Sequence, residues 1–275
     1  MSNLRVLRTG SALSLTGIRQ ACPAVFATSD DVVPTRGPRY EYIPTIEPLE
    51  RLLDQGWGVF EATQNRVRVA GKEGFCRHSL RLRKLDYEMN KYGGAAEGTG
   101  ELVLTNAHDG TAAYTLNAGF YRLVCSNGMT TGKTIAAHRI IHTKGRSTGM
   151  VIDVASRIIE EDFPRMMGQI EGFQNAVLSE QQTYELAEHA MALRYGLGLL
   201  PFKSVDLLKV RRSVDDGFSA WAVLNRVQEN VMQGGWDTKS IFTGRKSSVR
   251  AVEAIGPVAK INAGLWTKVE ELCNA

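Results

Sequence analysis

Residues 74–84 read GFCRHSLRLRK, an alternating pattern that is typical of a β-strand with two different faces. Successive side chains of a strand point to opposite sides of its sheet. One side would carry Cys76, His78, Leu80 and Leu82, and the other side would carry Arg77, Ser79, Arg81 and Arg83. The segment therefore predicts a sheet with one face in the core and a row of three guanidinium groups on the other.

Short alternating runs on both sides of this strand extend it into a meander. These runs are residues 57–71, 101–106, 111–119, 120–128 and 136–145. Asp109-Gly110 separates two of them and marks a hairpin turn, because both central residues of a type I′ turn need a positive φ. We expect an antiparallel meander of five or six strands between Trp57 and Thr143.

Helical patterns lie on both sides of the meander. The first 55 residues are expected as an extended arm that ends in a short helix, with Thr45 as its N-cap and Pro48 in its first turn. From residue 147 onward, apolar residues recur at intervals of three and four, which predicts helices. A strand region followed by helices indicates an α+β fold. The expected regions are an arm (1–55), a β-rich basic region (56–146) and a helical region (147–275), packed as a single compact unit.

The sequence also indicates where three of the helices begin and end. Ser179 and Gln182 resemble a capping box at the start of one helix. Asp215 or Asp216 is the expected cap of the next helix, which Gly234-Gly235 should end. Gly256-Pro257 is expected to divide the last helical run in two, since proline interrupts helical hydrogen bonding.

The distribution of charge points to a polyanionic partner. The 275-residue chain has a formal net charge of +4, but residues 60–150 alone carry 13 basic and seven acidic side chains. The positive excess therefore lies in the predicted sheet, where it favours a polyanion, although an unevenly charged solvated surface would look the same.

Other classes of protein are disfavoured by composition. No apolar run is long enough for a transmembrane helix, and the N-terminus lacks the features of a secretory signal. The four cysteines lie far apart without a Cys-x-x-Cys pair, so neither a zinc site nor a disulfide framework is expected. GMTTGKT (128–134) is one residue short of a phosphate-binding loop. We expect a cytoplasmic protein with no membrane contact and no cofactor.

Two groups of polar residues offer further interpretations. Asn106, His108, Asp109 and His138 could form the centre of a metal-dependent nuclease, although turn and surface roles are simpler. Trp221, Asn225, Gln228 and Glu229 fall on one side of a predicted helix. Buried polar groups must be paired, and Arg211, Arg212 and Arg250 are the expected partners. This stripe is either a buried hydrogen-bond network or a ligand site.

Three segments resemble a known protein family. They are NAHDGTAAYTLNAGFYRLVCSNGM (106–129), RRSVDDGFSAWAVLNRVQENVMQGG (211–235) and KINAGLWTKVEE (260–271). Their motifs are similar, in order, to those of domain-of-unknown-function family 932: an Asn-Ser-His-Asp-Gly turn (with Ala107 in place of Ser), an Arg-x-Val-Cys-Ser/Thr-Asn-Gly strand and an Asn-x-x-Gln-Glu-Asn helix. The resemblance covers about residues 40–272. It implies a protein carried by phages, plasmids and integrated elements.

A basic meander followed by helices is also similar in outline to the single-strand annealing proteins, such as the RecT-like and lambda Red-beta-like annealases. This likeness implies an oligomer that binds single-stranded DNA and anneals complementary strands without a cofactor. The expected phosphate contacts are Arg77, Arg81, Arg83, Lys84, Arg122, Lys133 and Arg139, with Phe120 or Tyr121 stacking on bases. The alternatives are the metal-dependent nuclease and a protein-binding anti-defence factor.

Overall fold

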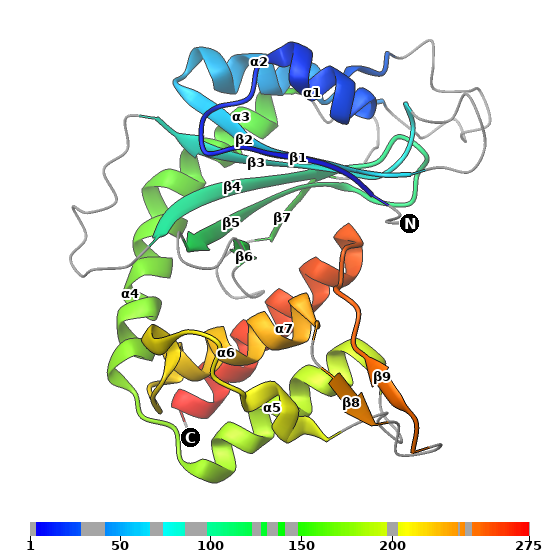
Figure 1. Cartoon of the computed structure of the whole chain (residues 1–275). Coiled ribbons are helices and arrows are strands. Elements are labelled where there is room, and N and C mark those ends of the chain that lie inside the picture. Colours follow the sequence, from blue (N-terminus) through cyan, green and yellow to red (C-terminus); the bar gives the residue numbers. More distant parts are fainter. Residues whose placement is uncertain are drawn as a thin grey trace. The chain divides into compact units, whose positions relative to one another are not determined.

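The expected α+β fold is confirmed in the structure, a computed structural model of the chain (Figure 1). It describes residues 4–28, 42–66, 74–85, 98–122, 128–130, 137–140, 148–196, 203–235, 237–239 and 244–274. The chain divides into two compact units: the first holds residues 1–128 and 136–164, and the second holds residues 129–135 and 165–275. The packing of the helical region on the β-rich region stays a prediction.

An antiparallel sheet is the main element of the first unit. Among the described residues, its strands are β1 (Leu4–Arg8), β2 (Trp57–Asn65), β3 (His78–Lys84), β4 (Gly98–Asn106), β5 (Tyr114–Arg122), β6 (Gly128–Thr130) and β7 (Ala137–Ile140). The strand order is β1-β2-β3-β4-β5-β6, and β7 also pairs with β5. The predicted meander is confirmed, because each strand from β2 to β4 pairs antiparallel with the next.

The two faces predicted for residues 74–84 are present in β3. The fully buried side chains of this strand are those of His78, Leu80 and Leu82. The register joins Leu80 to Leu104 on β4, and Leu104 to Leu116 on β5, so the apolar positions form one continuous face. Ser79, Arg81 and Arg83 share the other face.

Helices α1 (Leu15–Ala21), α2 (Ile46–Asp54) and α3 (Thr148–Arg157) cover the apolar face of the sheet (Figure 1). Leu49 and Leu52 of α2 are fully buried there. Pro48 lies in the first turn of α2, as predicted. Thr45 occupies the N-cap position but makes no capping hydrogen bond, because its hydroxyl bonds to side chains of the sheet instead.

Three features of the first unit differ from the sequence prediction. The expected arm contains α1 and also β1, which pairs along its length with β2. The sequence predicts separate strands in 111–119 and 120–128, but one strand, β5, crosses the boundary between them. Leu116, Ala118 and Phe120 are all buried, so every second side chain points to the core on both sides of Gly119. The loop between β4 and β5 is longer than a two-residue turn, although Gly110 has the expected positive φ, 75°.

Helices and a short hairpin make up most of the described part of the second unit. A π-helical turn (Ile158–Asp162) of the first unit joins α3 to α4 (Phe163–Asn175), which continues into the second unit. There α5 (Glu180–Tyr195), α6 (Ala220–Gln233), β8 (Asp237–Lys239), β9 (Lys246–Ser248) and α7 (Ile255–Cys273) follow. Helices α5, α6 and α7 contact one another, and Trp266 of α7 is fully buried. Within the described ranges, none of the helices combines the length and apolar character that a membrane span requires.

Two of the helix ends predicted from the sequence are present in the structure, and two predictions are wrong. The capping box of Ser179 and Gln182 is present, and Gly234-Gly235 end α6 with positive φ values. The cap of α6 is Ser219 instead of Asp215 or Asp216, because the Ser219 hydroxyl accepts the N–H of the first turn. Gly256-Pro257 lies in the first turn of α7 and does not divide it, since N–H groups there have no partner within the helix.

Candidate nucleic-acid interface

Polar side chains from many strands meet on the side of the sheet opposite α1, α2 and α3. We call this side the polar face, and its described residues include Arg8, Glu61, Thr63, Ser79, Arg81, Arg83, Glu101, Thr105, Thr115, Asn117 and Arg139. They share this side because they alternate with the buried apolar positions and are neighbours across the strands. One surface therefore collects side chains that lie far apart in the sequence.

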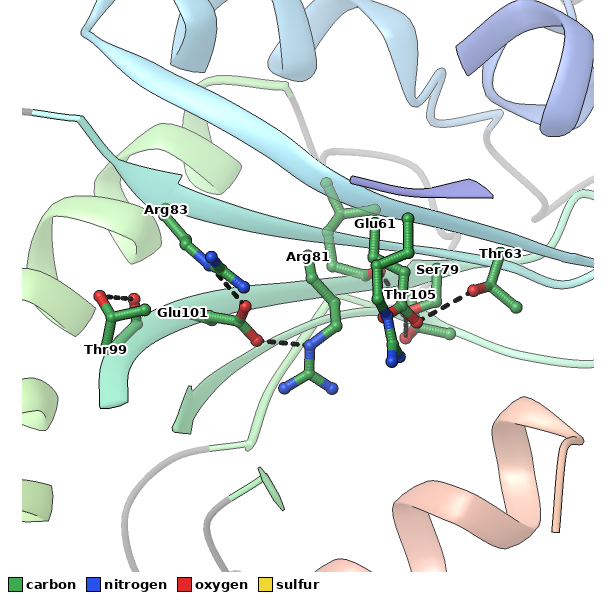
Figure 2. A network of polar contacts seen from close by, with 11 residues as sticks. Glu61, Thr63, Ser79, Arg81, Arg83, Thr99, Glu101 and Thr105 are labelled. Carbon is green, nitrogen blue, oxygen red and sulfur yellow. Dashed lines mark hydrogen bonds and ion pairs between the residues drawn. The ribbon is translucent and has the colours of Figure 1, made fainter. Parts of the chain in front are cut away.

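Opposite charges alternate across the polar face in an ion-pair ladder, which consists of Arg8, Glu61, Arg81, Glu101 and Arg83. Arg8 binds Glu61 on the neighbouring strand, and Glu61 is the register partner of Arg81. The two carboxylate oxygens of Glu101 each accept one hydrogen bond, from Nε of Arg81 and from Nε of Arg83, the latter at 2.9 Å (Figure 2). Two guanidinium groups of the predicted arginine row are thus held by one carboxylate.

Glu101 is the most enclosed member of the ladder. It is 0% exposed, and Arg81 is 8% exposed. A buried charge is costly unless it is paired and hydrogen-bonded, so Glu101 needs at least one arginine. Arg83 is half-buried, with its guanidinium 4.4 Å from the ring centroid of Phe60. Sequence reasoning does not identify Glu61 or Glu101; the available signal is their place in the alternating runs beside residues 74–84.

A hydroxyl row crosses the polar face next to the ladder. It consists of Thr63, Ser79, Thr105 and Thr115, which are successive register partners on β2, β3, β4 and β5. Thr105 donates to the hydroxyl of Ser79 at 3.2 Å (Figure 2). Arg139 of β7 pairs with Thr115 at the end of the row and is exposed. Arginine and hydroxyl side chains are common ligands of nucleic-acid phosphates.

The other two cations of residues 74–84 have separate environments. Arg77 is half-buried and donates from Nη2 to a carbonyl of the β4–β5 loop at 2.8 Å. Its Nε has no hydrogen-bond partner in the described structure. Lys84 alternates to the other side of β3 and donates to the carbonyl of Gln55 at the end of α2. Alternation with Ser79 and Arg81 assigns Arg77 to the side of the polar face, whereas Lys84 binds a helix end.

Of the remaining predicted nucleic-acid contacts, the structure describes the side chains of Phe120 and Arg139. Phe120 is 1% exposed on the apolar face of β5, where its ring cannot stack on a base while the core is intact. Tyr121 and Arg122 end the same strand, but their side chains are outside the described ones, and Lys133 lies outside the described residues. Arg139 is exposed.

His78 of the alternating run and Asn106 of the first motif belong to a buried hydrogen-bond network on the apolar face. The carbonyl of Cys76 can only accept, so Nδ1 of His78, 3.0 Å away, carries the proton. Nε2 of His78 then accepts from the Thr45 hydroxyl at 2.8 Å, and Asn106 donates to the same oxygen at 3.0 Å. The network joins β3, β4 and the start of α2, which is a structural role.

The other residues of the alternative metal site have separate partners. Nε2 of His108 lies 3.1 Å from a backbone carbonyl that follows α1. Asp109 accepts two hydrogen bonds within its own turn, and Nε2 of His138 lies 3.1 Å from the carboxylate of Asp162. Among the residues that the structure describes, no three His, Cys, Asp or Glu side chains are placed to hold a metal ion. The nuclease stays a prediction from the sequence.

Buried polar side chains also line α6, whose residues from Ala220 to Met232 are all buried. Arg212 donates to both carboxylate oxygens of Glu229 at 2.9 to 3.1 Å, and Arg211 donates to Asn230 at 2.6 Å. Both arginines lie in the segment before α6, so these bonds attach that segment to the helix.

The remaining residues of the expected stripe on α6 have partners of their own. Asn225 donates to the carbonyl of Trp221, and Gln228 donates to Asn262 on α7 at 3.1 Å. The backbone carbonyl of Arg250 accepts from Arg194. These contacts favour a buried hydrogen-bond network over a ligand site.

Comparison with known proteins agrees with the motifs. The family model for the domain of unknown function DUF932 matches residues 32–263. The chain belongs to the DUF932 family. Two relatives from Escherichia coli K12, the UPF0380 proteins YafZ and YfjQ, are 33% and 32% identical over 267 residues, which is 97% of this chain and 94% of each relative. No solved structure matches the chain. In this DUF932 protein, Asn106 of the first motif and Gln228, Glu229 and Asn230 of the third belong to buried hydrogen-bond networks.

Proposed function

We propose that this DUF932 protein binds single-stranded nucleic acid, and specifically single-stranded DNA, on the polar face of its sheet. The observation that carries the proposal is a row of arginine and hydroxyl side chains that are register partners on neighbouring strands. This row ends at the exposed Arg139. Such side chains bind the sugar–phosphate backbone, whose charge dominates affinity. The positive excess of residues 60–150 supports the same partner.

Strand annealing is the activity that fits such a surface best. A strand held through its backbone keeps its base edges available for pairing with a second strand. We therefore extend the proposal to cofactor-independent annealing by an oligomer of this chain, as a component of a phage, plasmid or integrated element. We also propose a cytoplasmic location, since the four cysteines lie far apart in the sequence and suggest no disulfide framework.

The test is fluorescence anisotropy of a labelled oligothymidylate over a series of salt concentrations, with no divalent metal. Arg77→Gln and Arg139→Gln each remove a cation from the polar face and leave the pairs of Glu101 intact. Each variant should lower the slope of log affinity against log salt by about 0.7 to 1 unit. Arg157→Gln on α3 removes the same charge from the opposite side of the sheet and should leave the slope unchanged.

The outcome decides between this surface and the alternatives. Equal slopes for all three variants and the wild type would place binding elsewhere on the protein. A folded wild type that does not bind at low salt would end the proposal, and the anti-defence alternative would then direct the search to a protein partner. Removal of both Arg81 and Arg83 is less informative, because Glu101 would be left buried without a cation at a cost of about 3–5 kcal/mol.

A further inference from the structure

The ion-pair ladder indicates how tightly the proposed surface holds its ligand. We infer that Glu101 is a built-in competitor of nucleic-acid phosphate for Arg83, and that it limits the affinity of the polar face for a polyanion. The inference rests on the proposed function. It concerns the regulation of that site by a residue of the chain itself.

Glu101 has the geometry of a bound anion. Each of its carboxylate oxygens accepts from the Nε of a different arginine, and the carboxylate is fully buried beside them (Figure 2). Carboxylates and phosphates present oxygens to guanidinium groups in similar ways. A phosphate that approaches Arg83 therefore meets a guanidinium group whose charge is already shared with a carboxylate.

The charge balance of the ladder separates this role from a purely structural one. Burial of Glu101 is offset by a single cation, and Arg81 alone, which is 8% exposed, would supply it. Arg83, whose side chain is more exposed than that of Arg81, adds a second cation. With Arg8 and Glu61 included, three cations face two anions, so the ladder keeps a net charge of +1.

Neutralising Glu101 should strengthen the binding of single-stranded DNA. In Glu101→Gln the side chain keeps its shape and one acceptor oxygen, while the ladder gains one unit of positive charge. We expect the affinity for a fluorescent oligothymidylate at low salt to rise roughly three- to tenfold. The slope of log affinity against log salt should steepen by about 0.7 unit.

The experiment compares four proteins: the wild type, Glu101→Gln, Arg83→Gln and the double variant. If the charge of the ladder controls affinity, Arg83→Gln binds most weakly, the double variant binds like the wild type, and Glu101→Gln binds most tightly. Glu160→Gln serves as the control, because it removes the same charge from an exposed position on the π-helical turn. It should leave affinity unchanged.

Each outcome separates the inference from the proposed function. A wild type that does not bind defeats both. A wild type that binds, with a folded Glu101→Gln whose affinity is unchanged or lower, defeats the inference alone. If Glu101→Gln does not fold, the comparison of Arg83→Gln with the double variant still decides, since equal affinities of these two would overturn the inference.

Discussion

At the scale of single residues, the hydroxyl of Tyr114 is a polar group that packing does not explain. Tyr114 is fully buried at the start of β5, and its hydroxyl has no hydrogen-bond partner in the described structure. Burial raises the pKa of this phenol, so it stays protonated. An unpaired buried hydroxyl costs about 1–3 kcal/mol. Tyr114→Phe should therefore leave the free energy of unfolding in urea unchanged or raise it by about 1 kcal/mol. A loss larger than about 1 kcal/mol would show that the hydroxyl has a partner.

Individual residues of the polar face show what can be predicted from sequence at this scale. Alternation places Arg81 and Arg83 opposite the apolar positions correctly, because the period of a strand is fixed at two. It does not supply Glu101 as their partner, since that contact depends on the register between β3 and β4. The aromatic ring of Phe120 has the chemistry that base stacking needs. The side chain nevertheless lies in the core, because it is on the same face of β5 as Leu116.

At the scale of elements, the end of α6 depends on one glycine. Gly234 has φ 59°, and a Cβ added there would lie 2.4 Å from the carbonyl oxygen of Val249. Gly235 has φ 71°, but a Cβ there would meet open space. Both alanine variants are strained by the positive φ, which costs about 1 kcal/mol, and Gly234→Ala must also displace the backbone. Chemical denaturation should show a loss of more than about 2 kcal/mol for Gly234→Ala and about half of that for Gly235→Ala. Equal losses would contradict the close approach.

The contact between α5 and α7 should make stability depend on pH. Burial, and next the charge of Lys268, lower the pKa of His189 below 6.5, while Glu271 and Glu185 act in the opposite direction. The unfolded chain therefore takes up this proton at a higher pH than the folded chain does. The contribution of His189 is complete above pH 6.5 and is lost as the pH falls from 6.5 toward the folded pKa. Thermal unfolding across this range should show a smaller decline for His189→Gln than for the wild type. Parallel curves would contradict the assignment.

Elements with a signal of their own are predicted from the sequence, and elements that depend on a partner are not. The capping box at Ser179 is local, so the four residues that form it suffice. Strand β1 has five residues, too few for a clear period, and it is a strand because it pairs with β2. The cap of α6 is Ser219, since the tight turn around Asp215 ends before the helix begins.

At the scale of the whole molecule, the order of patterns predicts the α+β class, because strand runs precede helical runs. No sequence pattern marks the division of the chain into two compact units. Their boundary near residues 164 and 165 falls within α4, where helical periodicity continues without a linker. Membership of the DUF932 family does not identify an activity. The proposed function therefore depends on the placement of charged side chains on the sheet.

The most direct measurement of the central claim is a map of where a bound strand touches the protein. An oligothymidylate with photoreactive thymine analogues would be bound to the wild type and irradiated, and the crosslinked peptides would be identified by mass spectrometry. We predict crosslinks to β3, β4 and β5 and near Arg139 of β7, which decline as salt is raised. Crosslinks confined to residues 165–275, or to α1, α2 and α3 on the opposite side of the sheet, would contradict binding on the polar face.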